Sequence, residues 1–269
     1  MKIILIISLI NLLLFQNVTA QAKDSTLSLN TAFLSEEELF YRVGYGLIKG
    51  GEASLVIRTE PIGDTQFFHI TAMAETTGMV GSMVTIKDIY ESYVNIETGY
   101  PIKSVRNIRE HNYTSYDEVL FFREQGFLRS INSGDHPAPN NVLDILSAFY
   151  FARRYLFSNE VVKDDTITLL TFFDNQFFPI VIKFKEFEEV KTKFGKIKCI
   201  KFVPLLKDSK VFVDEEQMQI WVTADKNFIP VKIRVKLPIG SLKCDIIDFK
   251  GIKDENGELI KSKKETSSD

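Results

Sequence analysis

The chain has 269 residues and a formal net charge of −3, because 33 Lys and Arg are set against 36 Asp and Glu. This mildly acidic balance excludes the concentrated basic surface that nucleic-acid binding requires. The length allows one large β domain or two small ones. The 22 Phe and 9 Tyr can form either a thick β core or the lining of an apolar ligand cavity.

The first twenty residues have the pattern of an export signal. Lys2 is followed by an apolar run from Ile3 to Phe15, and Val18 and Ala20 place small side chains before a cleavage point. We expect cleavage after Ala20 and a protein in the periplasm or outside a Gram-negative bacterium. An uncleaved anchor is the alternative, although a membrane crossing needs roughly 20 apolar residues. No Cys lies near the cleavage point, which argues against a lipoprotein anchor.

The remaining chain divides by composition. Removal of the signal takes away one positive charge and leaves a net charge of −4, and no later run is apolar and long enough to anchor the protein in a membrane. The polar start predicts a flexible linker, and the charged end predicts a disordered tail. The predicted segments are a linker at 21–35, a single large β domain at 36–252 with meander halves at 36–132 and 164–252 joined by a helix at 141–157, and a tail at 253–269.

The first half is expected to be an antiparallel meander, because short β-branched and aromatic runs alternate with turn signals. The predicted strands are Leu39–Leu47, Glu52–Thr59, Gln66–Ala74, Asp88–Asn95, Pro101–Arg109, Ser115–Phe122 and Gly126–Ile131. Gly50 and Gly51 predict a tight hairpin, since glycine adopts positive φ without steric cost. Residues 78–85 form either a short helix or an irregular flap, and residues 132–139 are predicted to be a loop.

One helix is clearly indicated after this loop. Asn141 is the expected N-cap, and Asp144 falls near the positive end of the helix dipole. Apolar residues at three- and four-residue steps form one face, made of Val142, Ile145, Leu146, Phe149, Ala152 and Leu156. We expect this helix to lie on one face of the sheet. Arg153 and Arg154 then fall in the last turn, where they could belong to a contact surface.

The second half again alternates apolar and charged residues, which is typical of strands with one buried face. The predicted strands are Thr166–Phe173, Ile180–Phe187, Lys196–Val203, Met218–Thr223, Val231–Lys236 and Leu242–Phe249. Cys199 and Cys244 lie in two of them. Export permits a disulfide between these cysteines if their strands are neighbours with Cα atoms within about 7 Å. Two separate buried thiols are the alternative.

An internal repeat connects the two halves. Tyr93–Arg106 resembles Ile220–Arg234, because each contains a strand, an acid-containing turn, an aromatic residue, a proline and a second strand that reaches an arginine. An acidic side chain in the turn can bond backbone N–H groups two residues on, and the proline begins a strand where no donor is needed. Two ordinary hairpins that converged on good turn chemistry are the alternative explanation.

These motifs resemble a family of exported bacterial proteins, the domain of unknown function number three thousand one hundred and eight. The matching stretches are Gly51–Leu55, Thr76–Met79, Asp88–Ser92, Pro101–Arg106, Gly195–Cys199, Trp221–Asp225 and Pro230–Val231. The hairpin of Trp, acid and Pro is also similar to that of periplasmic lipoprotein carriers. The resemblance implies a strongly curved, unclosed barrel with helices over its concave side and an apolar interior that holds acyl chains. It implies no catalytic residue. The expected fold class is therefore mainly β, an antiparallel, strongly curved sheet or open β-barrel with one main helix packed on it.

The sequence offers little catalytic chemistry. His69, His111 and His136 are far apart and lack metal-ligand spacing. No Gly-x-Ser-x-Gly elbow and no phosphate-binding glycine loop occur. We therefore expect no enzyme activity, no cofactor and no metal.

The leading hypothesis is an exported binding protein of the cell envelope that holds a lipid-like or other apolar ligand in the curved sheet. The candidate cavity residues are Tyr45, Phe67, Tyr93, Phe121, Phe149 and Trp221. For each of them, ordinary core packing is the alternative. A non-enzymatic envelope scaffold with a solid core is the second hypothesis, and a hydrolase is a remote third that would need a polar cleft. The ligand, the partner and the oligomeric state stay open.

Overall fold

The computed structural model describes residues 33, 36–46, 48–205, 217–237, 240–254 and 260. The predicted signal peptide lies outside these residues, as do most of the predicted linker and most of the predicted tail. Fourteen strands and two helices are found in the described part of the chain. They are β1 (Glu38–Tyr45), β2 (Ile48–Ile62), β3 (Thr65–Thr76), α1 (Gly78–Met83), β4 (Lys87–Asn95), β5 (Pro101–Glu110), β6 (Tyr113–Phe122), β7 (Phe127–Ser130), β8 (Gly134–Pro137), α2 (Ile145–Ser158), β9 (Thr166–Phe173), β10 (Gln176–Thr192), β11 (Gly195–Leu205), β12 (Met218–Thr223), β13 (Pro230–Lys236) and β14 (Ser241–Lys250).

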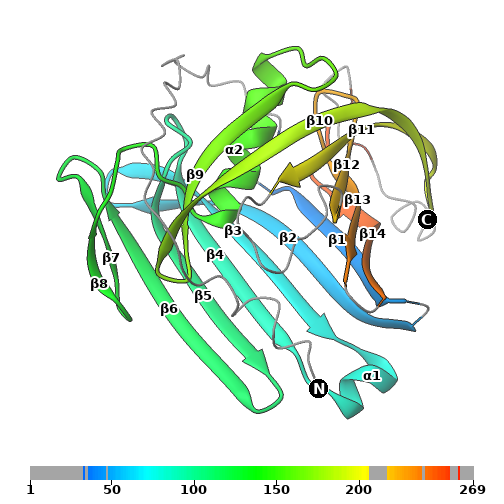
Figure 1. Cartoon of the computed structure of the whole chain (residues 1–269), viewed down its shortest axis with the longest axis horizontal. Helices are drawn as coiled ribbons and strands as arrows, with labels where there is room; N and C mark the ends of the chain where they lie inside the picture. Colours follow the sequence, from blue (N-terminus) through cyan, green and yellow to red (C-terminus); the bar gives the residue numbers. More distant parts are fainter. Residues whose placement is uncertain are drawn as a thin grey trace.

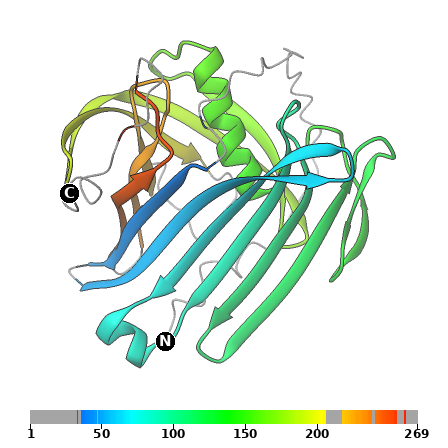
Figure 2. The same cartoon turned by 180° about the vertical axis from the view of Figure 1, so that it is seen from behind.

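All fourteen strands belong to one antiparallel sheet, in the order β8-β7-β6-β5-β4-β3-β2-β1-β14-β13-β12-β11-β10-β9. The first strand lies between β2 and the last strand, so the two meanders meet at the β1–β14 pair. Figures 1 and 2 show the sheet curving strongly around α2, and β8 and β9 are the two end strands of the sheet. The predicted fold class, an open barrel-like sheet with one main helix, is confirmed.

Interruptions of the strand register contribute to this curvature. The pairing shifts between Phe40 and Tyr41, between Val43 and Gly44, and again in β4, β10 and β12. An extra residue on one strand bends it and increases the local twist. A sheet with several such bulges can therefore curve around a helix instead of remaining flat.

Helix α2 occupies the concave side of the sheet. Its residues enter three separate hydrophobic clusters, one with β2, β3 and β4, one with β10, β11 and β12, and one with β9. The prediction that α2 buries a single apolar face is therefore incomplete, because the helix packs on more than one side. Because the sheet surrounds the helix, side chains outside that stripe are buried as well, among them Ser147, Tyr150 and Arg153.

The start of α2 also differs from the prediction. Asp144 is the N-cap, and its Oδ1 accepts hydrogen bonds from the backbone N–H groups of Leu146 (2.8 Å) and Ser147 (3.1 Å). The Ser147 hydroxyl accepts a bond from the Asp144 N–H in return, which completes a capping box. Asn141 is exposed and lies before the helix. The cap is placed at Asp144 because the Ser92 hydroxyl of β4 donates to its Oδ2 at 2.6 Å.

The predicted Gly50–Gly51 hairpin is wrong. The chain turns at Gly46, which has a φ of 59°, and both glycines lie inside β2. Their role is close packing, because a Cβ on Gly50 would lie 2.4 Å from Val80 and one on Gly51 would lie 2.9 Å from a β3 carbonyl oxygen.

Residues 78–83 of the undecided segment form α1, and residues 134–137 of the predicted loop form the edge strand β8.

Side chains link the two edges of the sheet across the opening. The β9–β10 turn has positive φ at both Asp174 (50°) and Asn175 (63°), as a two-residue type I′ hairpin requires. Asp174 accepts an ion-paired hydrogen bond from Arg106 of β5 at 2.9 Å. Asn175 accepts one from the Ser133 hydroxyl at 2.7 Å. This turn therefore holds the β9 edge against the opposite arm of the sheet.

Candidate functional site

The two sequence repeats fold alike. In the first, the register shifts so that Val94 of β4 pairs with Pro101, and in the second Val222 of β12 pairs with Pro230. Both prolines are the first residues of their strands, as predicted. In the second turn, Asp225 accepts hydrogen bonds from backbone N–H groups, as expected of an acid there.

The first turn achieves the same result with a different residue. Asn95 accepts hydrogen bonds from the N–H groups of Glu97 and Thr98, so the predicted acid is not the acceptor. An asparagine carbonyl supports an Asx turn as well as a carboxylate does. The two hairpins therefore share backbone geometry although their turn residues differ.

Two of the six cavity candidates occupy equivalent places in these hairpins. Lys103 lies over the Tyr93 ring (5.8 Å), and Lys232 lies over the Trp221 ring (5.7 Å). Tyr93 also stacks on His69 at 4.3 Å, and the Trp221 indole N–H donates to the Glu188 carboxylate at 2.8 Å. Tyr93 thus packs among charged side chains, whereas the Trp221 ring is buried in a hydrophobic cluster with lysines at its margin, and neither ring lines either of the two pockets described below.

Neighbouring arginines of α2 each contact one of the repeated turns. Arg154 donates to the carbonyl oxygens of Ile96 (3.2 Å) and Glu97 (3.1 Å) in the first turn. Arg153 donates to the Asn227 carbonyl oxygen (2.7 Å) in the second. Arg153 is 1% exposed and Arg154 is 2% exposed, so the expectation that they form a contact surface is wrong. They fix the helix to both halves of the sheet.

Arg153 also forms a buried ion pair. Its Nη1 and Nη2 lie 2.7 Å and 2.9 Å from the two carboxylate oxygens of Glu37. Burial alone would lower the pKa of Arg153, but the charge and hydrogen bonds of Glu37 outweigh that effect and raise it. Beside this pair, the buried Tyr41 hydroxyl has no hydrogen-bond partner among the described residues. Burial raises the pKa of Tyr41 well above its usual value.

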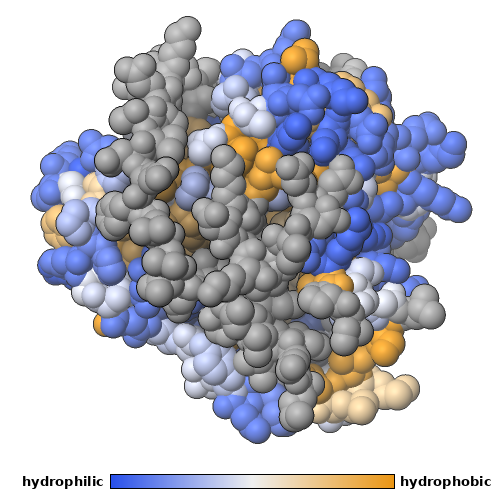
Figure 3. Space-filling view, in the orientation of Figure 1, coloured by the Kyte–Doolittle hydropathy of each residue, from blue (hydrophilic) through white to orange (hydrophobic). Residues whose placement is uncertain are grey.

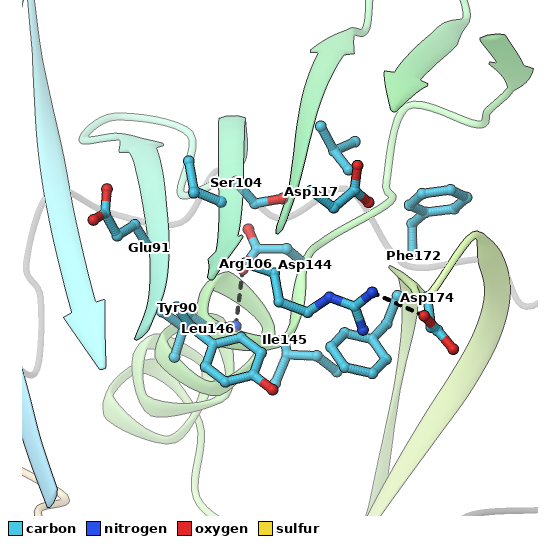
Figure 4. Close-up of a pocket in the computed structure, with 13 residues that line it drawn as sticks. Tyr90, Glu91, Ser104, Arg106, Asp117, Asp144, Ile145, Leu146, Phe172 and Asp174 are labelled. Carbon is cyan, nitrogen blue, oxygen red and sulfur yellow. Dashed lines mark hydrogen bonds and ion pairs between the residues drawn. The ribbon is translucent and has the colours of Figure 1, made fainter. Parts of the chain in front are cut away.

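A small pocket with several charged lining residues lies between the start of α2 and strands β4, β5, β6 and β9 (Figure 4). Its volume is about 40 Å³, and its charged lining residues are Glu91, Arg106, Asp117, Asp144 and Asp174. Burial raises the pKa of Asp144, although hydrogen bonds from Ser92 and the helix start oppose that effect. This volume suits ordered water and not an organic ligand.

A larger apolar pocket lies on the other half of α2, against β9, β10, β11 and β12. Its volume is about 190 Å³. Most of the residues around it are apolar, namely Phe149, Ala152, Leu156, Val161, Ile167, Ile182, Phe184, Phe202, Ile220 and Val222. Arg153, Tyr155, Asp165 and Thr166 add polar atoms, and the last two are exposed. The pocket is therefore an apolar space with a polar rim.

Of the six predicted cavity residues, Phe149 is the one that lines this pocket. Phe121 packs in a different cluster with Leu128, and Trp221 packs in a third with Cys199. Tyr45 is 36% exposed, and Phe67 is buried in β3. The sequence pattern contained information that could have identified the other lining residues. Phe149, Ala152 and Leu156 share the predicted helix face, and Ile182 and Phe184 share one face of the predicted strand Ile180–Phe187.

His69 lies against two carboxylates. Its Nδ1 is 2.7 Å from Glu60 and its Nε2 is 3.3 Å from Glu91, with the Thr71 hydroxyl 3.4 Å from the same Nε2. The carboxylate side chains are 44% and 28% exposed, so no dry cleft surrounds the imidazole. Within the described ranges, no group of three His, Cys, Asp or Glu side chains is arranged to hold a metal ion.

The two cysteines are free thiols. Cys199 is on β11 and Cys244 on β14, and β12 and β13 lie between these strands in the sheet. The condition for a disulfide, neighbouring strands, is not met, so the alternative of two separate thiols describes the structure. Burial raises the pKa of the Cys199 thiol to about 11 and that of Cys244 to about 12, which keeps both in the less reactive protonated form.

Comparison with known proteins places this fold and these hairpins in a family. Residues 41–247 match the family described as protein of unknown function, DUF3108, and the chain belongs to that family. Among curated proteins, none gives a significant match. In the described part of the chain, neither helix has the length and apolar character that crossing a membrane requires.

Two solved structures match this chain with very different scores. One is a β-barrel-like protein of the DUF1849 family from Brucella abortus, with a TM-score of 0.55 and 8% identity over 85% of this chain and 99% of that one. The other is a candidate exported protein with a YmcC-like fold from Bacteroides fragilis, with a TM-score of 0.36 and 10% identity over 81% and 97%. The first shares the barrel-like architecture, and the second similarity is too low to carry an argument.

Proposed function

We propose that this protein is an exported binding protein of the cell envelope that holds an apolar ligand between α2 and the second half of the sheet. The observation that carries the proposal is the pocket of about 190 Å³, whose walls are mostly apolar and whose rim includes the exposed Asp165 and Thr166. Ligand pockets characteristically combine apolar walls with a few polar groups. The export pattern of residues 1–20 supports the envelope location.

The size of the pocket restricts the ligand. Pockets for drug-sized molecules have volumes of roughly 300–1,000 Å³, and this one is smaller. An unbranched acyl chain is the class that fits, with its end between Phe149 and Phe184 and its polar group at Asp165 and Thr166. A hydroxyl or neutral headgroup suits that rim better than a carboxylate, because Asp165 would repel a second negative charge.

The small volume also favours the second candidate, a scaffold with a solid core. In that case the pocket is a packing irregularity, and the edges and ends of the sheet provide the functional surface. The two candidates differ in one measurable property, which is whether a ligand occupies the space beside α2.

We further propose that the protein is not an enzyme. The support is the environment of His69, whose carboxylate neighbours are substantially exposed. A catalytic base or acid is usually found in a cleft with a perturbed pKa. A hydrolase would instead require a nucleophile and a substrate-sized cleft at this histidine.

Mass spectrometry under non-denaturing conditions, on protein purified from its own host, tests the binding function. We expect a bound species whose mass, released by organic extraction, corresponds to an acyl-chain compound. Protein that is uniformly unbound, and that also fails to take up added fatty alcohols or fatty acids, would contradict the proposal and favour the scaffold.

A further inference from the structure

Exposed apolar side chains gather at one end of the sheet. Met79 and Met83 of α1 are 83% and 76% exposed, and Ile48 at the start of β2 is 60% exposed. We call this surface the apolar tip. It consists of Tyr45, Ile48, Met79, Met83, Val84 and Leu242. Figure 3 shows an apolar area at the lower right, where Figure 1 places α1 and the neighbouring strand ends.

The tip is continuous in the structure. Tyr45 pairs with Leu242 on one side and with Ile48 on the other. From Ile48, β2 leads to Gly50, whose carbonyl oxygen accepts a hydrogen bond from the Thr77 N–H at 2.9 Å. The strand ends and α1 are therefore joined at this point.

The core does not account for the composition of α1. The helix contributes no buried residue, and Figures 1 and 2 show it beyond the ends of β3 and β4. The segment from Thr76 to Ile86 contains no charged residue, in a chain where 26% of residues are charged. Within α1, Val80 packs closely on the strands, against Gly50. A projecting segment that has no fully buried residue, carries no charge and exposes two methionines is suited to an external apolar phase.

Three lysines border the apolar tip. Lys49 adjoins Ile48, Lys87 follows the α1 segment at the start of β4, and Lys236 ends β13 beside Leu242, and all three are exposed. Glu75 faces Lys87 across the β3–β4 pair, and the exposed Glu52 lies opposite Glu75 on β2, so these acids offset part of the lysine charge. An uncharged apolar projection with lysines around its base complements the acyl region and anionic headgroups of a bilayer. The partly exposed Tyr45 suits the headgroup level, where amphipathic aromatic rings are favoured.

We propose that the apolar tip docks the protein reversibly on anionic lipid bilayers, with the methionines of α1 entering the acyl region. A protein partner is a poorer match, because α1 presents a small convex projection of flexible side chains and not a broad complementary surface. This inference does not depend on the ligand pocket, since no residue of the tip lines it.

Vesicle flotation tests the proposal. Purified protein, expressed from the full-length sequence, is mixed with vesicles of phosphatidylethanolamine and phosphatidylglycerol or with vesicles of phosphatidylcholine alone. We expect binding to the anionic vesicles that weakens with salt, and binding about tenfold or more weaker for Met79→Asn/Met83→Asn, since each methionine loses its apolar burial. The matched control is Ile131→Asn/Val162→Asn, which changes two exposed apolar residues outside the tip and is expected to bind as the unchanged protein does.

A Met79→Trp variant gives a second readout. Its fluorescence is expected to shift to the blue with anionic vesicles, while the Ile131→Trp variant is expected to show no shift.

The proposal is overturned if the unchanged protein does not float, if the Asn variants at the tip bind equally well, or if those variants abolish self-association in sedimentation velocity without a vesicle effect. The Asn variants are expected to retain the native melting temperature and any acyl-ligand binding, so failure here and failure of the proposed function are distinguishable.

Discussion

Arg153 in α2 and Glu37 just before β1 form a two-point ion pair, with N–O distances of 2.7 Å and 2.9 Å, although 116 residues separate them in the chain. Both side chains are 1% exposed. The same guanidinium donates to the Asn227 carbonyl oxygen in the second repeated turn. This pair therefore connects the helix with the junction of the two meanders.

Removal of one partner should destabilise the fold strongly. Arg153→Met or Glu37→Gln leaves the other polar group buried without its counterpart, and we expect a loss of about 3–5 kcal/mol in unfolding free energy. The double variant Glu37→Leu/Arg153→Met should lose less than the sum of the single losses, because no uncompensated charge remains. Urea denaturation of the four proteins measures this coupling. Single losses under about 1 kcal/mol, or strict additivity, would contradict the assignment.

The cap of α2 gives a sharp comparison between two nearby residues. Asp144→Ala removes the acceptor for the helix N–H groups and leaves the Ser92 hydroxyl unpaired, so we expect a loss of about 2–3 kcal/mol. Asn141→Ala should change the stability by less than about 0.5 kcal/mol, because Asn141 is exposed and outside the helix. Thermal and urea unfolding report both values. Equal effects would mean that the helix begins earlier than the structure shows.

The strands were predictable because alternation and turn residues are local signals. Pro101 and Pro230 open strands as their sequence positions indicate, and the two repeated hairpins share a bulge. The burial of the two α2 arginines was not predictable, since they look like exposed last-turn cations until their distant acceptors, Glu37 and the turn carbonyls, are known. Gly50 was misassigned for a similar reason. Glycine is required at position 50 because Val80 leaves no room there for a Cβ. That contact forms only on folding and is not part of local turn geometry.

The pocket was only partly predictable. Phe149 belongs to the apolar helix face that the sequence reveals, and Ile182 belongs to an alternating strand face. Nothing local indicates that these two faces meet, because the β8–α2–β9 connection determines which strands lie opposite the helix. The aromatic residues Tyr93 and Trp221 were chosen for their size, yet Tyr93 stacks on His69 and Trp221 packs in a hydrophobic cluster away from the pocket.

A carboxyl pair near the α1 end should make stability depend on pH. Burial raises the pKa of Asp88, and burial together with the charge of Asp88 raises the pKa of Glu110. A folded-state pKa above the unfolded value means that the native state binds more protons, so this contribution is complete below the unfolded pKa and is lost as the pH rises through the folded one.

Asp88→Asn should therefore stabilise the protein at neutral pH and lose that advantage in acid. The amide oxygen can still accept the hydrogen bond that the Arg109 N–H donates to Asp88 at 3.2 Å. The exposed Asp64→Asn serves as the control and should show no such pH trend. Urea midpoints at several pH values give the result, and a variant that is less stable at pH 7 than at pH 4, relative to the unchanged protein, would refute the sign.

The cysteines should be unpaired and slow to react. Alkylation of the denatured, non-reduced protein is expected to add two labels, whereas the native protein should label slowly because desolvation raises the pKa of both thiols. Intact-protein mass spectrometry reads both outcomes. A denatured protein that accepts labels only after reduction would show that Cys199 and Cys244 are joined after all.

The most direct test of ligand binding is a calorimetric titration with decan-1-ol, a neutral unbranched alcohol, against the unchanged protein and an Ala152→Phe variant. Ala152 lines the apolar pocket, so a phenyl group there should displace the chain, while Ala74→Phe on the exposed part of β3 makes the same chemical change elsewhere. We predict saturable binding that Ala152→Phe weakens at least tenfold and Ala74→Phe leaves unchanged. Equal binding by all three proteins, or none by any of them, would contradict the assignment of the pocket as a ligand site.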